Sequence, residues 1–197
     1  MLKTGPLAHG GVMVNYRCTA ACRHCLYACS PSRSGAYLSR SAARGICAEL
    51  RKGRIGSVHI GGGEPFLDFE GLIAVIQELA RAGITLDYIE TNAYWALEDS
   101  APAKVARLQD EGIGALCISV DPFHAEYVPC ERPLHLARLC HSAQMEYFLW
   151  RQEFLPALGR LDKEKIHSRP EMEKLLGKDY IRSTAEAYGI GIGGRAV

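Results

Sequence analysis

Short apolar runs rich in β-branched and aromatic residues alternate with longer amphipathic segments along most of this chain. The runs predict six strands, at residues 12–17, 57–61, 86–91, 115–120, 145–150 and 189–194. The middle four begin about 29 residues apart, close to the ~30 residues that a strand, a crossover helix and their turns require. This rhythm predicts a parallel sheet covered by helices.

The segments between the runs carry helix signals. Apolar residues recur at helical spacing, as Ile46 and Leu50 do, and Ser39 and Gly53 stand where an N-cap and a C-terminal glycine belong. One or two further helices are expected in the more charged region 151–188. The other expected helices lie within 39–53, 68–83, 100–112 and 132–143.

Six strand–helix units fit either an open doubly wound sheet or an incomplete barrel, and periodicity does not decide between them. A full eight-stranded barrel takes ~250 residues, whereas this chain has 197. We expect one domain spanning 1–197, which ends immediately after its sixth strand and is therefore either a minimal or a truncated form of its fold.

Composition and charge narrow the function classes. The net charge is +1, with 23% charged and 48% hydrophobic residues, so no nucleic-acid surface is evident. The first residues lack the apolar core of a signal peptide, and no stretch approaches the ~18 apolar residues of a membrane span. We therefore expect a cytoplasmic protein, whose eight cysteines are metal ligands or buried thiols and not disulfides.

Residues that can carry chemistry follow the expected strands at their carboxyl ends. Cysteines follow the first strand, GGGEPF the second, TNAYW the third and DPFHAEY the fourth. In parallel α/β folds the carboxyl ends of the strands form one face, and ligands bind there. We expect these loops to converge on one site.

Four of the eight cysteines fall in the stretch CTAACRHCLYAC, at positions 18, 22, 25 and 29. One interpretation is a closed structural zinc site with four thiolates. The other is an iron–sulfur cluster, whose irons bind thiolates at short spacing. If Cys18, Cys22 and Cys25 alone are ligands, a four-iron cluster keeps one iron open to chemistry.

Two motifs together resemble the radical S-adenosylmethionine (radical SAM) superfamily: Cys18-x3-Cys22-x2-Cys25 after the first strand, and Gly62-Gly63-Glu64-Pro65 after the second. The resemblance covers nearly the whole chain. It implies a partial (β/α)6 barrel of parallel strands with outer helices, forming a single radical SAM-like catalytic domain. Among the two topologies left open above, it selects the barrel.

The resemblance also implies cofactors and their ligands. Cys18, Cys22 and Cys25 would hold a 4Fe-4S cluster, and the open iron would chelate the amino and carboxylate groups of S-adenosyl-L-methionine. The Gly62-Gly63-Glu64 motif would receive the amino group, since glycines let the backbone approach an ammonium closely. Cys29 would then be a small buried residue and not a ligand.

Other positions match the family less specifically. Asn92 occupies the place of a TN pair, for which turn chemistry is the structural alternative. Ser119 and Asp121 stand where the family contacts ribose hydroxyls or the cofactor carboxylate, and helix capping is the alternative. Arg195 is a candidate contact for a carboxylate at the mouth of the site.

The sequence departs from the family at His24, where an aromatic residue usually precedes the third cysteine, and at the fifth strand, which lacks a glycine-isoleucine-glycine pattern. The remaining cysteines are expected to be structural, with Cys130 left open. The ones expected in the core are Cys47, Cys117 and Cys140.

The function that the resemblance implies is that of an oxidoreductase. It reductively cleaves S-adenosyl-L-methionine to a 5′-deoxyadenosyl radical, which abstracts hydrogen from a small-molecule or peptide substrate. The electron would come from a donor such as flavodoxin or ferredoxin. Two alternatives remain: a non-catalytic iron–sulfur or zinc binding module, and a partner subunit that binds S-adenosyl-L-methionine without cleaving it.

The substrate pocket is expected to combine aromatic and polar side chains. His124 is the candidate proton donor or acceptor, with a locally satisfied histidine at a helix start as the alternative. The candidate aromatic residues of the pocket are Trp95, Phe123, Tyr127 and Trp150.

Overall fold

The computed structural model describes residues 7–188 of the chain, and its centre is a five-stranded parallel sheet. The expected strand at 189–194 and Arg195 lie outside the described residues. The strands follow one another in space as they do in sequence: β1 (His9–Met13), β2 (Ser57–Gly61), β3 (Thr85–Thr91), β4 (Leu116–Ser119) and β5 (Tyr147–Trp150).

This strand order decides between the two topologies that the sequence left open. In a doubly wound sheet the order reverses at a switch point, whereas here each strand adds to the same side of the last. Right-handed crossovers then place every connecting helix on one face of the sheet. The expectation of parallel strands with outer helices, arranged as in a partial barrel, is confirmed.

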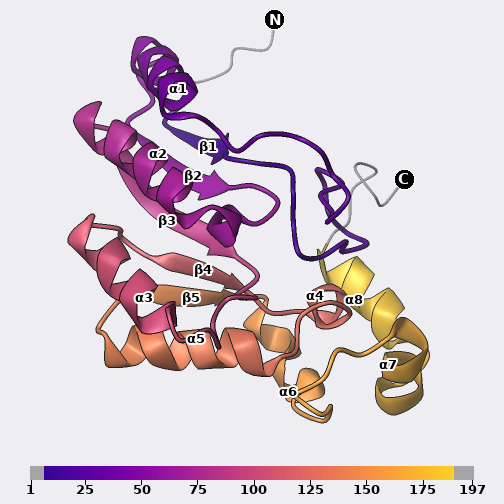
Figure 1. The fold of residues 1–197 in the computed structure, drawn as a ribbon. Coiled ribbons are helices and arrows are strands. Elements are labelled where there is room, and N and C mark those ends of the chain that lie inside the picture. The colour runs from indigo at the N-terminus through magenta and orange to yellow at the C-terminus, as the bar shows by residue number, and fades with distance from the viewer. Residues whose placement is uncertain (1–6, 189–197) are drawn as a thin grey trace, which may run out of the picture.

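The connecting helices cover that outer face, and in Figure 1 α2, α3 and α5 lie in front of the strands. The main hydrophobic core fills the space between these helices and the sheet, where Val58, Ile60 and Ile89 point outward from the strands. The four helices are α1 (Arg40–Lys52), α2 (Phe69–Arg81), α3 (Ala101–Asp110) and α5 (Glu131–Ser142).

Most of the expected boundaries agree with the structure to within two residues, but that of the first strand does not. β1 ends at Met13, so four residues of the expected 12–17 lie in the following loop. The α1 cap is confirmed, because Ser39 accepts from the Ala42 backbone N–H at 3.2 Å. Gly53 follows that helix with φ −73°, and the left-handed residue is Arg54 instead.

The chain after β5 forms three short helices where one or two were expected: α6 (Leu155–Leu158), α7 (Arg169–Leu176) and α8 (Tyr180–Tyr188), after a 3-10 turn, η2 (Gln152–Phe154). With the short helix α4 (Pro122–Ala125), this region forms a second apolar cluster against the cysteine loop. Between β2 and α2 lies another 3-10 turn, η1 (Pro65–Leu67). None of the helices in the described part of the chain is long and apolar enough to cross a membrane.

Candidate functional site

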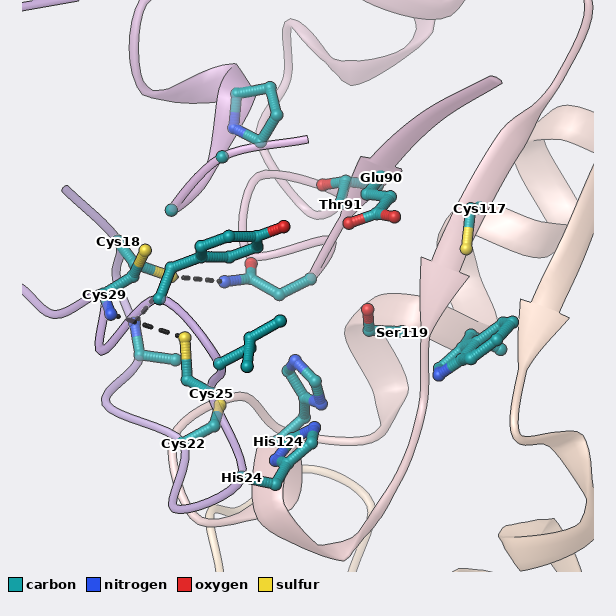
Figure 2. A pocket seen from close by; sticks show the side chains of 18 of the residues that line it. Cys18, Cys22, His24, Cys25, Cys29, Glu90, Thr91, Cys117, Ser119 and His124 are labelled. Atoms are coloured by element: carbon teal, nitrogen blue, oxygen red, sulfur yellow. Dashed lines mark hydrogen bonds between the residues drawn. The ribbon is translucent and has the colours of Figure 1, made fainter. Parts of the chain in front are cut away.

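The loops at the carboxyl ends of the strands converge on a cavity of about 400 Å³, as the topology predicts. Figure 2 shows the four clustered cysteines on one side of this cavity, facing His24 and His124 and the ends of β3 and β4. The residues that line it include Cys18, Cys22, Cys25, Cys29, Gly62, Gly63, Glu90, Asn92, Ser119, His124 and Trp150.

The cysteine sulfurs accept hydrogen bonds from nearby N–H groups. The Ala20 backbone N–H and the Asn92 side-chain amide donate to Cys18 Sγ at 3.4 and 3.5 Å. The Cys29 backbone N–H donates to Cys25 Sγ at 3.3 Å (Figure 2). Such bonds stabilise thiolates, which are the form that binds iron.

Burial raises the pKa of Cys18 to about 12, so iron binding must displace its proton. The thiols are nonetheless oriented for one shared ligand, because Cys18, Cys22 and Cys25 all reach the same cavity. A donor set of three thiols with N–H groups directed at the sulfurs fits an iron–sulfur cluster.

Cys29 is buried, as expected, but Cys18 and Cys22 are buried too, and Cys29 borders the same cavity. Its pKa is raised by a hydrogen bond to Cys25 and by burial. It therefore lies beside Cys25 at the edge of the cavity, closer to the candidate site than a core residue would be.

The loop after β2 pairs with the loop after β1 along the backbone. Gly63 N–H donates to the carbonyl of Asn15 at 3.0 Å, and Glu64 N–H donates to the carbonyl of Arg17 at 2.9 Å. The Asn15 side chain completes the pairing by donating to the Glu64 carbonyl at 2.9 Å and accepting from Gly63 N–H at 2.9 Å. We call this pairing the loop seam; it fixes the backbone next to Cys18.

The loop seam explains the glycines in a way that the sequence does not reveal. A Cβ on Gly63 would lie 2.0 Å from the Arg17 carbonyl oxygen, and one on Gly62 would lie 2.8 Å from Asn15 Oδ1. Backbone atoms of Arg17 have no room to retreat without moving Cys18. Glycine is thus required for the approach of two loops, in addition to any contact with a cofactor.

Glu64 is fully buried, and its carboxylate does not reach the cavity. It accepts from Phe66 N–H at 3.1 Å, from the Thr91 hydroxyl at 2.9 Å and from Asn92 N–H at 2.8 Å. Burial raises its pKa to about 7, against the opposing effect of these bonds. The carboxylate therefore joins the loop after β2 to the end of β3.

Asn92 and Ser119 lie at the cavity as expected, whereas Asp121 does not. The Asn92 amide donates to Cys18 and also to the Thr19 hydroxyl at 3.0 Å. The Asp121 carboxylate is buried and caps α4 by accepting from the backbone N–H groups of Phe123 and His124 at 2.8 and 3.0 Å. The capping alternative therefore describes Asp121.

His124 is held between Asp121 and the cysteines. Its Nδ1 lies 2.5 Å from Asp121 Oδ2, and its ring borders the cavity beside Cys22. Burial lowers the pKa of His124, but Asp121 and Cys22 outweigh it, so the pKa is raised well above its usual value. His24 packs on Phe123 with ring centroids 4.6 Å apart, and its Nε2 lies 3.9 Å from Asp121 Oδ2.

Four residues were expected in the wrong environment, among them Phe123 and Tyr127, which do not line the cavity. Trp95 is not a pocket residue, because it is fully buried and stacks on Phe66 with centroids 4.3 Å apart. Cys117 faces the cavity and not the core beneath the helices. Trp150 borders the cavity as expected, and Cys47, Cys130 and Cys140 are buried.

Sequence reasoning also missed Asn15, Tyr88 and Glu90. Asn15 lies two residues after the end of β1. An asparagine at this position gives no sign in the sequence that its amide both donates to and accepts from another loop. Tyr88 and Glu90 alternate with Ile89 in β3, so the period-2 pattern places them on the face opposite the helices. The alternation along β3 could therefore have identified Tyr88 and Glu90 as residues of the inner face.

Comparison with known proteins identifies the family. A family model described as a 4Fe-4S single cluster domain matches residues 10–121, more than half of the chain. The chain belongs to this family. The match confirms the predicted 4Fe-4S cluster and the resemblance from which that prediction came.

A curated relative is the "Putative peptide biosynthesis protein YydG" of Bacillus subtilis (strain 168), 27% identical over 119 residues, which are 59% of this chain and 37% of that protein. Two solved structures of Streptococcus suis SuiB, each 12% identical, cover 95% of this chain. One is bound to the precursor peptide SuiA (TM-score 0.47, 48% of that chain) and one to S-adenosylmethionine (TM-score 0.45, 50%). The chain spans half or less of these proteins.

The loop seam predicts that Gly63→Ala destabilises the fold and the cysteine loop together. The added Cβ overlaps the Arg17 carbonyl, so we expect a loss of about 2–3 kcal/mol in urea denaturation and a lower iron content after reconstitution. The matched control is Gly45→Ala in α1, where a Cβ meets nothing within 4 Å and the helix should gain about 0.5–1 kcal/mol. Wild-type iron content in Gly63→Ala would contradict the loop seam.

The carboxylate contacts predict that Glu64→Gln destabilises the protein. Thr91 Oγ1 already accepts from Ala93 N–H and Trp95 Nε1, so its own hydrogen goes to Glu64, and every partner of Glu64 is a donor. A glutamine NH₂ faces one of these donors in either orientation, at a cost of about 1–3 kcal/mol. Exposed Glu146→Gln is the control, and equal urea midpoints for the two variants would refute the assignment.

Proposed function

We propose that this chain is a radical enzyme that reductively cleaves S-adenosyl-L-methionine and uses the 5′-deoxyadenosyl radical to abstract hydrogen from a peptide. The observation that carries the proposal is the single cavity that holds Cys18, Cys22 and Cys25 together with the Gly62–Gly63 backbone. Three thiols leave one iron of a 4Fe-4S cluster without a protein ligand, and that iron is where the cofactor is proposed to bind.

The residues of the chain have distinct parts in this proposal. Cys18, Cys22 and Cys25 hold the cluster, which would supply the electron for the cleavage. Gly62 and Gly63 offer a wall without side chains to the methionine amino group. The Ser119 side chain lines the cavity at the end of β4, where it would contact the cofactor ribose.

Other candidate residues act in this proposal through neighbouring groups of the protein. Asn92 acts on Cys18 through its amide, and Glu64 and Asp121 position neighbouring backbone. His124, oriented by Asp121, is the proposed proton donor or acceptor on the cysteine side of the cavity. An external one-electron donor such as flavodoxin or ferredoxin completes the reaction.

A peptide is the proposed substrate class. The curated relative is named for peptide biosynthesis, and the cavity is rimmed by large apolar side chains that are exposed. Leu26 is 62% exposed and borders the cavity with Tyr27 and Trp150. Exposed apolar groups at a cavity mouth suit a partner that brings apolar side chains of its own.

The enzyme proposal predicts cofactor cleavage. Reconstituted protein that is reduced with dithionite in the presence of S-adenosyl-L-methionine should form 5′-deoxyadenosine, detected by chromatography and mass spectrometry. Cys22→Ala, which removes one cluster ligand, is the matched control and should form none. A protein with a full cluster that binds the cofactor and yet forms no 5′-deoxyadenosine would instead be a partner subunit.

The ligand assignment predicts the iron content of cysteine variants. Alanine at Cys18, Cys22 or Cys25 removes one of three anchors and should abolish cluster binding. Cys29→Ala should keep close to four irons and four sulfides per chain, because in this assignment its thiol hydrogen-bonds to Cys25 and does not bind iron. Loss of the cluster in Cys29→Ala, with retention in one of the other three variants, would reverse the assignment.

A further inference from the structure

A line of four polar side chains crosses the inner face of the sheet, the face opposite the helices. His9 comes from β1, His59 from β2, and Asp87 and Glu90 from β3. The outward side chains of the same strands are apolar, as Val58 is, so this line is a distinct feature of the inner face. The proposed reaction does not yet use any of these four groups.

Two of the three distances along the line are hydrogen-bond distances. Asp87 Oδ2 lies 2.9 Å from His9 Nδ1, and His9 Nε2 lies 3.0 Å from His59 Nδ1. His59 Nε2 lies 3.8 Å from Glu90 Oε1, longer than a hydrogen bond, so the Glu90 side chain has to move toward His59 before a proton can pass.

The line connects the cavity with the surface at the other end of the strands. Glu90 borders the cavity, and its side chain is 47% exposed. His9 and Asp87, near the amino ends of β1 and β3, have side chains that are 43% and 36% exposed. A peptide in the cavity would cover Glu90 but not the two residues at the far end.

The sheet provides space for this line through two glycines. A Cβ on Gly11 would lie 2.8 Å from the imidazole of His59, and a Cβ on Gly61 would lie 3.2 Å from Glu90 Oε2. The planes of the His9 and His59 rings are 19° apart, and Tyr88 stacks on His59 at 7° with centroids 5.1 Å apart. The imidazoles are therefore held in a fixed orientation.

The contacts also set the order of the protons. A carboxylate at Asp87 only accepts, so His9 carries its hydrogen on Nδ1, where the Ser57 hydroxyl is a second neighbour at 3.1 Å. Neutral His9 then accepts at Nε2 from His59 Nδ1–H. His59 Nε2 is left as an acceptor that faces Glu90.

We propose that Glu90 is the base that takes a proton from a substrate bound in the cavity, and that His59, His9 and Asp87 carry this proton to the surface. The inference rests on the proposed function for its substrate. Glu90 passes its proton to His59 Nε2, His59 Nδ1–H passes one to His9 Nε2, and His9 Nδ1–H passes one to Asp87. One proton leaves the substrate, one reaches solvent, and no electron moves; both rings end in the opposite tautomer.

The surroundings agree with a neutral imidazole at His59 next to a carboxyl at Glu90 that takes up a proton readily. Burial raises the pKa of Glu90, with His124 opposing, and burial together with His9 lowers the pKa of His59, with Asp87 opposing. The other titratable groups near the line are Tyr88 and Cys117, whose pKa values are both raised by burial. Neither Tyr88 nor Cys117 supplies a competing charge near neutral pH.

The first test is the tautomer of each histidine, measured by ¹⁵N NMR of the histidine-labelled, reconstituted protein. We expect the hydrogen on Nδ1 in both His9 and His59 where the rings are neutral. A hydrogen on Nε2 of His59 would overturn the proposed direction of transfer. A purely structural pair with the same contacts would show the same tautomers, so the second test is the one that separates a relay from a structural pair.

The second test is the coupling of the two ends of the line. Glu90→Gln removes a carboxylate from His59, so the His59 titration midpoint should shift downward, whereas Glu146→Gln should leave it in place. His59→Phe keeps an aromatic ring beside Tyr88 but removes the titrating imidazole. Because coupling between two titrating groups is reciprocal, the titration midpoint of Glu90 should shift in this variant as well. Independent titration of His59 and Glu90 would overturn the relay.

These measurements need no cleavage of the cofactor. Absence of 5′-deoxyadenosine with coupled titrations would refute the radical function and leave the proton line in place. Cleavage with uncoupled titrations would refute the line alone.

Discussion

The arrangement of the site depends on the loop seam, in which the backbone of Gly63 and Glu64 pairs with that of Asn15 and Arg17. The seam continues the β1–β2 pairing beyond the last regular strand residue, so Cys18 is fixed by the sheet although it lies in a loop. Its closeness requires glycine at 63, since any Cβ would overlap the Arg17 carbonyl. The loop that carries Cys18 is therefore held by backbone hydrogen bonds, as a strand would be.

The loop seam is part of a closed ring of hydrogen bonds next to Cys18. Glu64 leads from the seam to Thr91 and Asn92 at the end of β3, and Asn92 leads back to Cys18. Three strand ends are thus joined through buried hydrogen bonds, and every donor in the ring finds an acceptor. Buried polar networks that are fully satisfied make a structure rigid, which is what a site that holds a cofactor by several loops requires.

The two faces of the sheet differ in polarity and in what covers them. The outer face is apolar and covered by helices, and it supplies the main core. The inner face carries His59, Tyr88 and Glu90, and it opens into the cavity at the carboxyl ends of the strands. Successive side chains of a strand point to opposite faces of the sheet. Once the apolar residues face the core, the residues between them therefore face the cavity.

Much of this architecture follows from sequence. The β2 strand was placed correctly because SVHIG alternates and is bounded by glycine, and the convergence of Cys18, Gly62 and Asn92 follows from parallel topology alone. The loop seam does not follow, since backbone pairing between irregular segments leaves no period. The burial of Trp95 does not follow from the sequence either. Its indole N–H donates to the Thr91 hydroxyl four residues earlier, and this local hydrogen bond allows the whole side chain to be buried.

Mössbauer spectroscopy of ⁵⁷Fe-reconstituted protein, with and without S-adenosyl-L-methionine, tests the central claim most directly. Three cysteine ligands and one open iron predict a 4Fe-4S spectrum in which one iron site in four changes its isomer shift when the cofactor is added. A spectrum that the cofactor leaves unchanged, in a protein with a full cluster, would contradict the account, because no iron would then be open to the cofactor.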